Sequence, residues 1–188
     1  MSRYVFEFSE GNASQKDLLG GKGANLAEMT NLGLPVPPGF TITTDACRVF
    51  LGTGELPSEL ADEIDAHLAG LETTMGRTLG HIDDPLLVSV RSGAKFSMPG
   101  MMETVLNIGL NDDSVEGLAK VSDNPRFAWD SYRRLLSMFG NTVLGIDRSV
   151  FDDALDELKT GRGAASDIDL VADDFRELVS TYHAIVKE

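Results

Sequence analysis

Hydrophobic residues are spaced differently in the two halves of the chain. In the first half they gather in short runs that are rich in aromatic and β-branched residues. This composition is typical of β-strands, and it predicts strands at residues 4–8, 40–44, 86–90 and 104–108. The run at 86–90 carries no charge, so we expect a central strand that is covered on both faces.

Other apolar residues recur every three or four positions, which is the spacing of an amphipathic helix. Helices are expected at 24–32, where a glycine-rich first turn precedes the apolar face and Gly33 ends it, and briefly at 45–51. A longer helix is expected to begin at Pro57, because proline is favoured at the first helical position. The apolar face of this longer helix contains Leu60, Ile64, Leu68, Leu71 and Met75.

The second half of the chain has the pattern of a helical region. Asn124 and Pro125 form a pair of N-cap and first helical residue, and the helix that they begin is expected to stop at Gly140. Two further amphipathic stretches follow at 150–158 and 171–186. The apolar face of the first of these three helices contains Phe127, Ala128, Tyr132, Leu135, Leu136 and Phe139.

Together these patterns predict an α+β fold in two parts. Residues 1–110 are expected to form an α/β lobe, in which a small mixed sheet with flanking helices carries the phosphate-binding elements. Residues 111–188 are expected to form a helical subdomain. Its last helix reaches Glu188 without a stop signal, so we expect the subdomain to be truncated there.

Composition and charge exclude several classes of protein. The chain has 30 acidic and 16 basic residues and a net charge of −14, which leaves no broad cationic surface for nucleic acid or an anionic membrane. Its apolar runs are far shorter than the roughly 18 residues of a membrane span. A single cysteine, Cys47, permits no intramolecular disulfide, and the polar start lacks a secretory signal, so we expect a cytoplasmic protein. Apolar neighbours predict that Cys47 is a core thiol.

The segment 20–25, Gly-Gly-Lys-Gly-Ala-Asn, has the ingredients of a phosphate site. It combines backbone freedom, a helix N-terminus and the ammonium group of Lys22. It does not match the P-loop, because Lys16 stands where that motif has its first glycine, nor the dinucleotide fingerprint, because Leu26 replaces the third glycine. A tight turn with an exposed lysine is the alternative.

Arg91 follows the predicted central strand. A guanidinium group at the end of a buried strand requires a partner, which is either a ligand phosphate or a carboxylate of the protein. The stretch 86–102 has two basic residues and no carboxylate, and its glycines let backbone N–H groups approach an anion. We therefore expect a polyphosphate-binding loop at 92–102 that is mobile without ligand.

Few other residues suggest a site. Met98, Met101 and Met102 either line an apolar slot for a nucleotide base or fill core space. The three histidines, His67, His81 and His183, have no metal-ligand spacing, and no metal site is expected. Arg133 and Arg134 either dock a partner or lie on a solvated helix face.

Several of these motifs together resemble the N-terminal part of the pyruvate phosphate dikinase family. Related phosphoenolpyruvate synthases and antibiotic phosphotransferases share the glycine-lysine segment and the Val-Arg-Ser element, whereas the Ser-Met-Pro-Gly-Met-Met segment favours the dikinases. The motifs are Gly-Asn-Ala-Ser at 11–14, the glycine-lysine segment within 18–29, Pro-Gly-Phe-Thr at 38–41, Ser-Val-Arg-Ser-Gly-Ala at 89–94, Ser-Met-Pro-Gly-Met-Met-Glu-Thr at 97–104 and Asn-Pro-Arg-Phe-Ala-Trp-Asp-Ser-Tyr-Arg-Arg at 124–134.

The resemblance implies part of an ATP-grasp nucleotide-binding domain, in which Lys22 and Arg91 contact the phosphates of ATP. We expect these two side chains to converge on one cleft, because one lies at a helix start and the other ends a central strand. The resemblance also implies a loop that covers the phosphates. The loop residues are Ser92, Gly93, Ala94, Lys95, Gly100, Met101 and Met102.

The family transfers phosphoryl groups from ATP to a histidine carrier domain, to phosphate and finally to pyruvate in a barrel domain. The sequence has no Thr-Ser-His carrier motif, and the magnesium-binding carboxylates of the second ATP-grasp lobe are expected elsewhere. We therefore expect the 188-residue chain to contain no catalytic residue, to bind ATP weakly and to be inactive alone, within a homo-oligomeric parent enzyme. The alternatives are a phosphoenolpyruvate synthase-like ATP-binding domain and a noncatalytic nucleotide-binding or interaction module.

Overall fold

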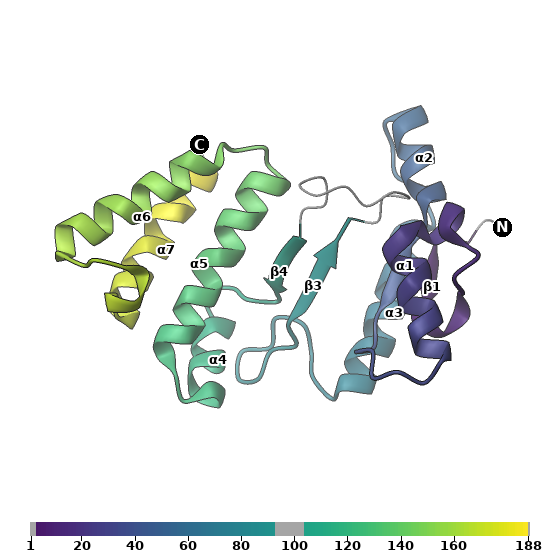
Figure 1. The fold of residues 1–188 in the computed structure, drawn as a ribbon, viewed down its shortest axis with the longest axis horizontal. Helices are drawn as coiled ribbons and strands as arrows, with labels where there is room; N and C mark the ends of the chain where they lie inside the picture. Colours follow the sequence, from purple (N-terminus) through teal and green to yellow (C-terminus); the bar gives the residue numbers. More distant parts are fainter. Residues whose placement is uncertain (1–2, 93–103, 188) are drawn as a thin grey trace. The chain divides into compact units, whose positions relative to one another are not determined.

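A computed structural model describes residues 3–92 and 104–187. The described chain forms two compact units, each with helices and a two-stranded sheet (Figure 1). Unit 1 contains the residues up to Gly76 together with Ser92, and unit 2 contains Arg77–Arg91 and the residues from 104 onward. The α+β class is therefore confirmed. None of the helices in the described ranges is long and apolar enough to cross a membrane.

Unit 1 is built around a short antiparallel pair of strands. Strand β1 (Val5–Glu7) pairs with β2 (Phe40–Ile42), with Phe6 opposite Thr41. Because side chains alternate across a strand, Val5 packs with Ala46 and Leu60 on one face. On the other face, Phe6 packs against the cluster of Leu19, Ala24 and Ala27.

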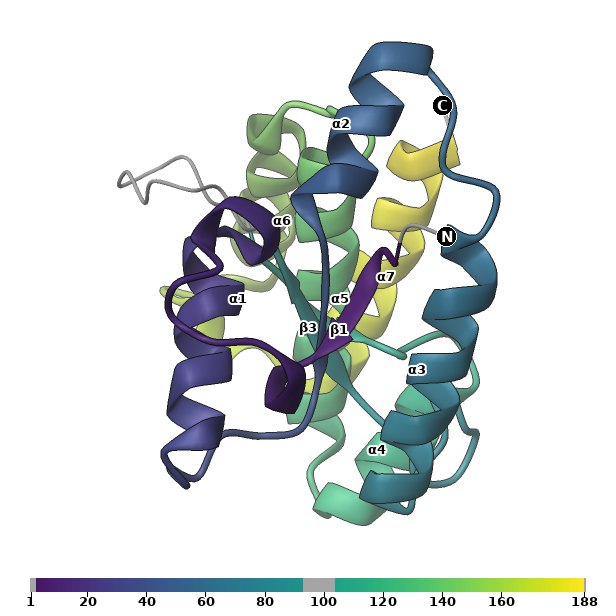
Figure 2. The ribbon, with the colours of Figure 1, turned by 90° about the vertical axis from the view of Figure 1, so that its right-hand side faces the viewer.

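Three α-helices cover this pair of strands. They are α1 (Lys16–Asn31), α2 (Thr44–Thr53) and α3 (Leu60–Met75), and a single 3₁₀ turn (Phe8–Glu10) follows β1. Figure 2 shows α1 and α3 on opposite sides of β1. A carboxylate of α3 binds the backbone at the start of β1. Glu63 Oε2 accepts hydrogen bonds of 2.8 Å from the backbone N–H groups of both Tyr4 and Val5.

Helix α1 begins at Lys16, four residues before the glycine segment 20–23 that is predicted as its first turn. It is interrupted at Gly20, whose φ of 69° and ψ of 172° are not helical. A positive φ of this kind is accessible to glycine without a steric penalty. The predicted glycine-rich first turn therefore exists as the turn that follows the kink, inside a longer element. Gly33, with a φ of 74°, follows the end of the helix as predicted.

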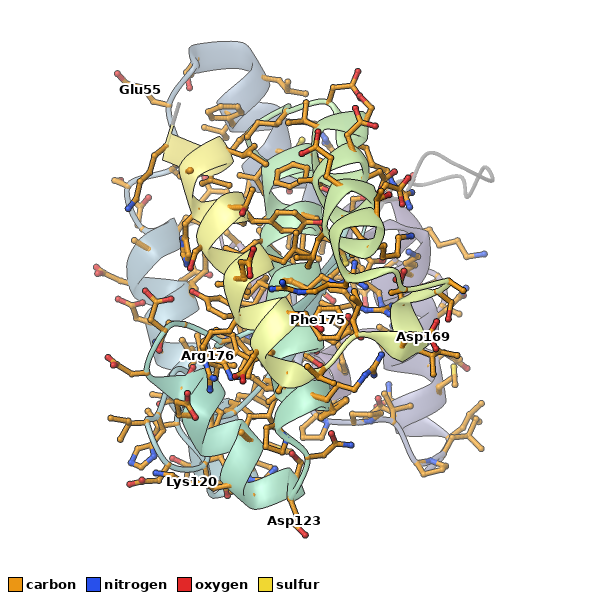
Figure 3. The ribbon with its side chains drawn as sticks, turned by 90° about the vertical axis from the view of Figure 1, so that its left-hand side faces the viewer. Glu55, Lys120, Asp123, Asp169, Phe175 and Arg176 are labelled. Atoms are coloured by element: carbon orange, nitrogen blue, oxygen red, sulfur yellow. The ribbon has the colours of Figure 1, made fainter. Side chains whose placement is uncertain are left out.

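Unit 2 is mainly helical. Strand β3 (Val88–Arg91) pairs antiparallel with β4 (Thr104–Ile108), with an irregular register between Val88 and Val90. The helices are α4 (Ser114–Ser122), α5 (Pro125–Thr142), α6 (Arg148–Arg162) and α7 (Ala172–Lys187), and a 3₁₀ turn (Asp167–Asp169) lies between the last two. Aromatic residues of α5, α6 and α7 meet in one core (Figure 3), and the largest of them are Trp129, Tyr132, Phe151, Phe175 and Tyr182.

The start of α5 is correctly predicted, but its buried face is partly wrong. Asn124 Oδ1 accepts a hydrogen bond of 3.0 Å from the Phe127 backbone N–H, and Pro125 is the first helical residue. The helix ends at Thr142 instead of Gly140. Phe127 and Phe139 are 48% and 39% exposed, whereas Trp129, which was not assigned to the face, is buried.

Two predictions about the strands are wrong. The described strands form two separate antiparallel pairs, not one mixed sheet. The run at 86–90 is not a central strand with two covered faces: Leu86 is 4% exposed but precedes β3, whereas Val90 within β3 is 56% exposed and Arg91 is exposed. The apolar run thus begins in the core and leaves it along β3.

Two local predictions in unit 1 are also wrong. Pro57 precedes α3 by three residues, and the helix begins at Leu60. Cys47 is exposed, because Ala46 is the buried residue of α2. The predicted boundary between lobes at residues 110 and 111 remains a prediction, while the two compact units divide at residues 76 and 77.

Candidate functional site

Lys22 lies in the first turn after the kink of α1. Its side chain is partly buried, and it forms no ion pair with a carboxylate of the described residues. The other described lysines without an ion pair, Lys16, Lys120 and Lys187, are exposed. Lys22 is thus a partly buried cation without a counter-ion among the described residues of a strongly acidic chain, as is typical of an anion-binding lysine.

Arg91 is the last residue of β3, opposite Thr104 of β4. Its side chain is exposed, and none of the ion pairs between described residues includes it. The argument that burial forces Arg91 to find a partner therefore fails. The Arg91 guanidinium group lies at the end of a short strand and has no carboxylate partner among the described residues. Its five N–H donors are of the kind that bind phosphate.

Most other arginines are already neutralised by carboxylates within the described ranges. Eight of them form ion pairs, some with two carboxylates each. They are Arg3, Arg48, Arg77, Arg133, Arg134, Arg148, Arg162 and Arg176. Lys22 and Arg91, the two residues that the motifs single out, differ from this group because they form no such ion pair within residues 3–92 and 104–187.

Several contacts fix the part of α1 that carries Lys22. Two side chains in the last turns of α1 hold the loop that precedes the helix. Glu28 Oε2 accepts a hydrogen bond of 3.0 Å from the Ala13 backbone N–H, and Asn31 Nδ2 donates one of 2.7 Å to the Gly11 carbonyl. These two hydrogen bonds thus hold the Gly-Asn-Ala-Ser motif at 11–14 against α1. At the other end, Thr44 and Arg48 of α2 both donate to the Asp17 carbonyl.

Comparison with known proteins identifies the family. A sequence model described as "Pyruvate phosphate dikinase, AMP/ATP-binding domain" matches residues 16–66 and 51–131, which include Lys22 and Arg91. The chain belongs to this family. The predicted resemblance to the dikinases is therefore confirmed, and the phosphoenolpyruvate synthase alternative is not favoured.

Individual dikinases are similar along the whole chain. Identity is 51% over 189 residues to pyruvate, phosphate dikinase of Clostridium symbiosum, which covers 100% of this chain and 22% of the relative. It is 54% over 186 residues to pyruvate, phosphate dikinase 1, chloroplastic, of Zea mays (96% and 20%), and 47% over 193 residues to the dikinase of Rhizobium meliloti (100% and 22%). The chain spans about a fifth of the length of these dikinases.

The structure does not test whether the two dikinase-motif cations converge. Lys22 lies in unit 1 and Arg91 in unit 2, so their approach remains a prediction. Ser92 is exposed and has no regular secondary structure. The remaining predicted loop residues lie outside the described residues, and the predicted mobility of the loop lies there too. They are Gly93, Ala94, Lys95, Gly100, Met101 and Met102.

Sequence reasoning missed a buried polar network in unit 2. Arg133, predicted to lie on a solvated face or to dock a partner, is 8% exposed. It donates to Asp130 at 2.7 Å and to Asp167 at 3.1 Å. The spacing of three residues between Asp130 and Arg133 was the available signal, because such residues are neighbours on a helix.

A second cluster joins α5, α7 and the loop before α4. The Tyr132 hydroxyl lies 2.9 Å from Asp112 Oδ1 and 3.1 Å from His183 Nε2. Burial of Tyr132 and its hydrogen bond to the Asp112 carboxylate raise the pKa of the phenol well above its usual range. Tyr132 is therefore a neutral structural donor. Groups of three or more metal-ligating side chains are not found in the described ranges.

Proposed function

We propose that this chain is the ATP-binding part of a pyruvate phosphate dikinase and that it adopts part of an ATP-grasp fold. The observation that carries the proposal is the match to the AMP/ATP-binding domain family over residues that include both candidate cations. The acidic composition supports a site for a small anion over a nucleic-acid surface, because the few free cations are local.

In this proposal Lys22 and Arg91 hold the phosphates of ATP. An ammonium group acts as a point charge beside the phosphate chain, and a guanidinium group binds two phosphate oxygens at once. The kink at Gly20 gives a new helix start directly before Lys22, where backbone N–H groups face an anion. The loop Ser92 to Met102 covers the phosphates.

The proposal includes Mg²⁺ as a companion of ATP. A bound metal ion would offset the charge that develops during phosphoryl transfer. Its carboxylate ligands are expected outside residues 1–188, as the family resemblance implies. Within this chain, Lys22 and Arg91 contribute binding and orientation of the nucleotide, and no catalytic residue is assigned.

We further infer that the complete enzyme converts ATP, pyruvate and phosphate to AMP, phosphoenolpyruvate and diphosphate. The relatives are named for pyruvate and phosphate. A phosphohistidine carrier domain and a pyruvate-binding domain are the expected partners, in a homo-oligomer. A cytoplasmic location is expected from the cysteine content, although the Zea mays relative is named as chloroplastic.

The test separates the two half-reactions of the complete enzyme. Arg91→Leu is expected to abolish ATP-dependent autophosphorylation and to leave phosphoryl exchange between pyruvate and phosphoenolpyruvate unchanged, because the second reaction uses another domain in this family. Arg148→Leu is a matched control, since Arg148 is an exposed arginine paired only with Asp152, and it is expected to change neither reaction. Comparable losses in both half-reactions of Arg91→Leu would make Arg91 structural and contradict the proposal.

The competing function is a noncatalytic nucleotide-binding module. The reading frame beyond residue 188 distinguishes the two. A carrier histidine and a barrel domain downstream support the dikinase, whereas a stop codon after Glu188 favours the module.

A further inference from the structure

A close approach between α1 and β2 lies one residue after Lys22. A Cβ atom placed on Gly23 would lie 2.8 Å from Thr41 Cγ2, 2.9 Å from Thr41 Oγ1 and 3.2 Å from Leu19 Cβ. Real carbon atoms do not approach each other at 2.8 Å, so a side chain at position 23 would require the Thr41 side chain to turn away or α1 to shift from β2. Gly23 is itself buried.

This contact lies on the inner face of α1. Gly23 and Ala27 lie four residues apart in the helical turns after the kink at Gly20, which places them on one side of the helix, and both are buried, as is Leu19 before the kink. Lys22 is offset by one residue, about 100° around the helix axis. The Lys22 side chain therefore leaves α1 at the margin of the surface that rests on β2, consistent with its partial burial.

The ends of α1 cannot move freely to relieve a clash at position 23. The Asp17 carbonyl is held by Thr44 and Arg48 of α2. Glu28 and Asn31 are tied to the loop at 11–13. Because packed interiors transmit strain, we expect the displacement to fall between these anchors, in the stretch 18–27 that carries Lys22.

We propose that Gly23 and Thr41 are positioning residues for Lys22. Their contact sets the distance between the Lys22 backbone and β2. It thereby orients the Lys22 ammonium group toward the phosphates of ATP. This inference rests on the proposed function, since it requires Lys22 to bind ATP, but it adds two residues that touch no ligand.

The first experiment measures ATP affinity by titration calorimetry, with Mg²⁺ present, on the full natural polypeptide. Gly23→Ala is expected to raise the Kd for ATP on the order of tenfold or more, because displacements of about 1 Å have effects of that size. Gly23→Ala combined with Thr41→Ala is expected to restore the affinity, since the alanine at 41 vacates the space that the new methyl group needs. Gly70→Ala is the matched control, as nothing lies within 4 Å of its added Cβ.

The second experiment asks whether the effect acts through Lys22. In a Lys22→Met background, Gly23→Ala is expected to cause no further loss of ATP affinity, because a positioning residue has nothing left to position. An additive loss would mean that Gly23 acts on the fold or on another contact, and it would overturn the inference. Circular dichroism and the urea midpoint of every variant establish that the compared proteins are folded. If Gly23→Ala alone does not fold, the single substitution Thr41→Ser replaces it in the test. Thr41→Ser removes the Cγ2 packing against α1, so it is expected to weaken ATP binding in the wild-type background. In the Lys22→Met background, the same substitution is expected to cause no further loss of ATP affinity.

Failure of the inference is distinguishable from failure of the proposed function. If Lys22→Met leaves ATP affinity unchanged, the proposed function of Lys22 is wrong, and the inference falls with it. If Lys22→Met weakens binding but Gly23→Ala does not, the phosphate role stands and only the positioning role is wrong. Absence of rescue by Thr41→Ala in the folded double variant also contradicts the positioning role.

Discussion

The two compact units hold their helices in place by different means. Unit 2 has a single cluster of fifteen buried hydrophobic residues in the described ranges, and several of these are aromatic. Unit 1 has two clusters with three buried residues each, and half of those six are alanines. A large core fixes helices through interlocking side chains. In unit 1 the clusters are smaller, and hydrogen bonds from side chains to backbone groups and the tight contact of Gly23 with the Thr41 side chain contribute to this task.

The difference suggests where each unit tolerates change. Side-chain truncation should harm unit 2 more than unit 1, because unit 2 has the larger buried cluster. The candidate cation Lys22 lies in the unit with the smaller clusters, so its geometry depends on a few contacts that can be altered one at a time. The following predictions test this contrast.

The largest effect is expected from Phe175→Ala in the centre of unit 2. Phe175 is fully buried and contacts the guanidinium groups of Arg126 and Arg133, which lie 5.2 Å and 5.5 Å from its ring centre. Loss of about 3–5 kcal/mol in the free energy of unfolding is expected for such a truncation. Leu60→Ala in unit 1 is the comparison, with an expected loss near the lower limit of about 2 kcal/mol, and urea denaturation measures both.

Hydrogen exchange locates these two losses. Phe175→Ala should accelerate amide exchange in α5 and α7, and Leu60→Ala in β1 and α3. Equal losses from both substitutions would contradict the contrast between the cores.

An intermediate effect is expected from Gly117→Ala, a test of close backbone approach in unit 2. An added Cβ would overlap the Ile82 carbonyl oxygen and lie 2.7 Å from that of Asp83. Backbone atoms cannot rotate away as side-chain ends do, so a loss of about 1–3 kcal/mol is expected. Gly70→Ala, with open space around it, should instead stabilise by about 0.4–1 kcal/mol. Thermal unfolding of the two variants gives the sign of each change, and a neutral Gly117→Ala would show that the loop at 82–83 yields readily.

The smallest effect is expected from Asp174→Asn, and it depends on pH. Asp174 accepts hydrogen bonds from the Val171 backbone N–H at 2.9 Å and from Arg162 Nε at 2.6 Å. The Val171 hydrogen bond and the nearby Arg162 guanidinium lower the pKa of this carboxyl group, although its burial acts in the opposite direction. The stabilisation is therefore complete above the unfolded-state pKa and is lost as the pH falls through the lower folded-state pKa.

The variant should be about 1 kcal/mol less stable than the wild type at pH 7, the size of a lost helix cap. The difference should shrink below about pH 4, where the unfolded carboxyl group becomes protonated. Urea titrations at pH 7 and pH 3 measure it. A difference that is the same at both pH values would assign the loss to packing instead of charge.

Local features of the fold follow from the sequence, and features that depend on distant partners do not. The Asn124 and Pro125 start of α5 and the position of Gly33 are encoded by neighbouring residues, and both were predicted correctly. The run at 86–90 was placed in a central strand because composition alone does not reveal where a chain leaves the core. Cys47 and Arg133 were misjudged for the same reason, since their burial depends on helices that pack from elsewhere in the chain.

The candidate site shows the same division. Lys22 could be identified as a phosphate-binding candidate because glycines, a helix start and a cation are adjacent in sequence. The contact between Gly23 and Thr41 could not, because it joins two elements that are separated by a loop and reflects a distance that no pattern encodes. The premise that Arg91 is buried is wrong, and its phosphate-binding role remains a prediction.

The two hydrogen bonds from Tyr4 and Val5 to Glu63 also affect the order in which the molecule folds. They join residues that are 59 and 58 positions apart, so the first strand of the chain is completed by the last helix of unit 1. Closing a loop of this length costs entropy before any contact compensates for it. During synthesis, the hydrogen bonds to Glu63 therefore form only after about sixty further residues have left the ribosome, later than β1 can pair with β2. In unit 2, by contrast, α4 and α5 are sequence neighbours and can pair as soon as they emerge, so we expect the later half of the chain to fold faster than the half made first.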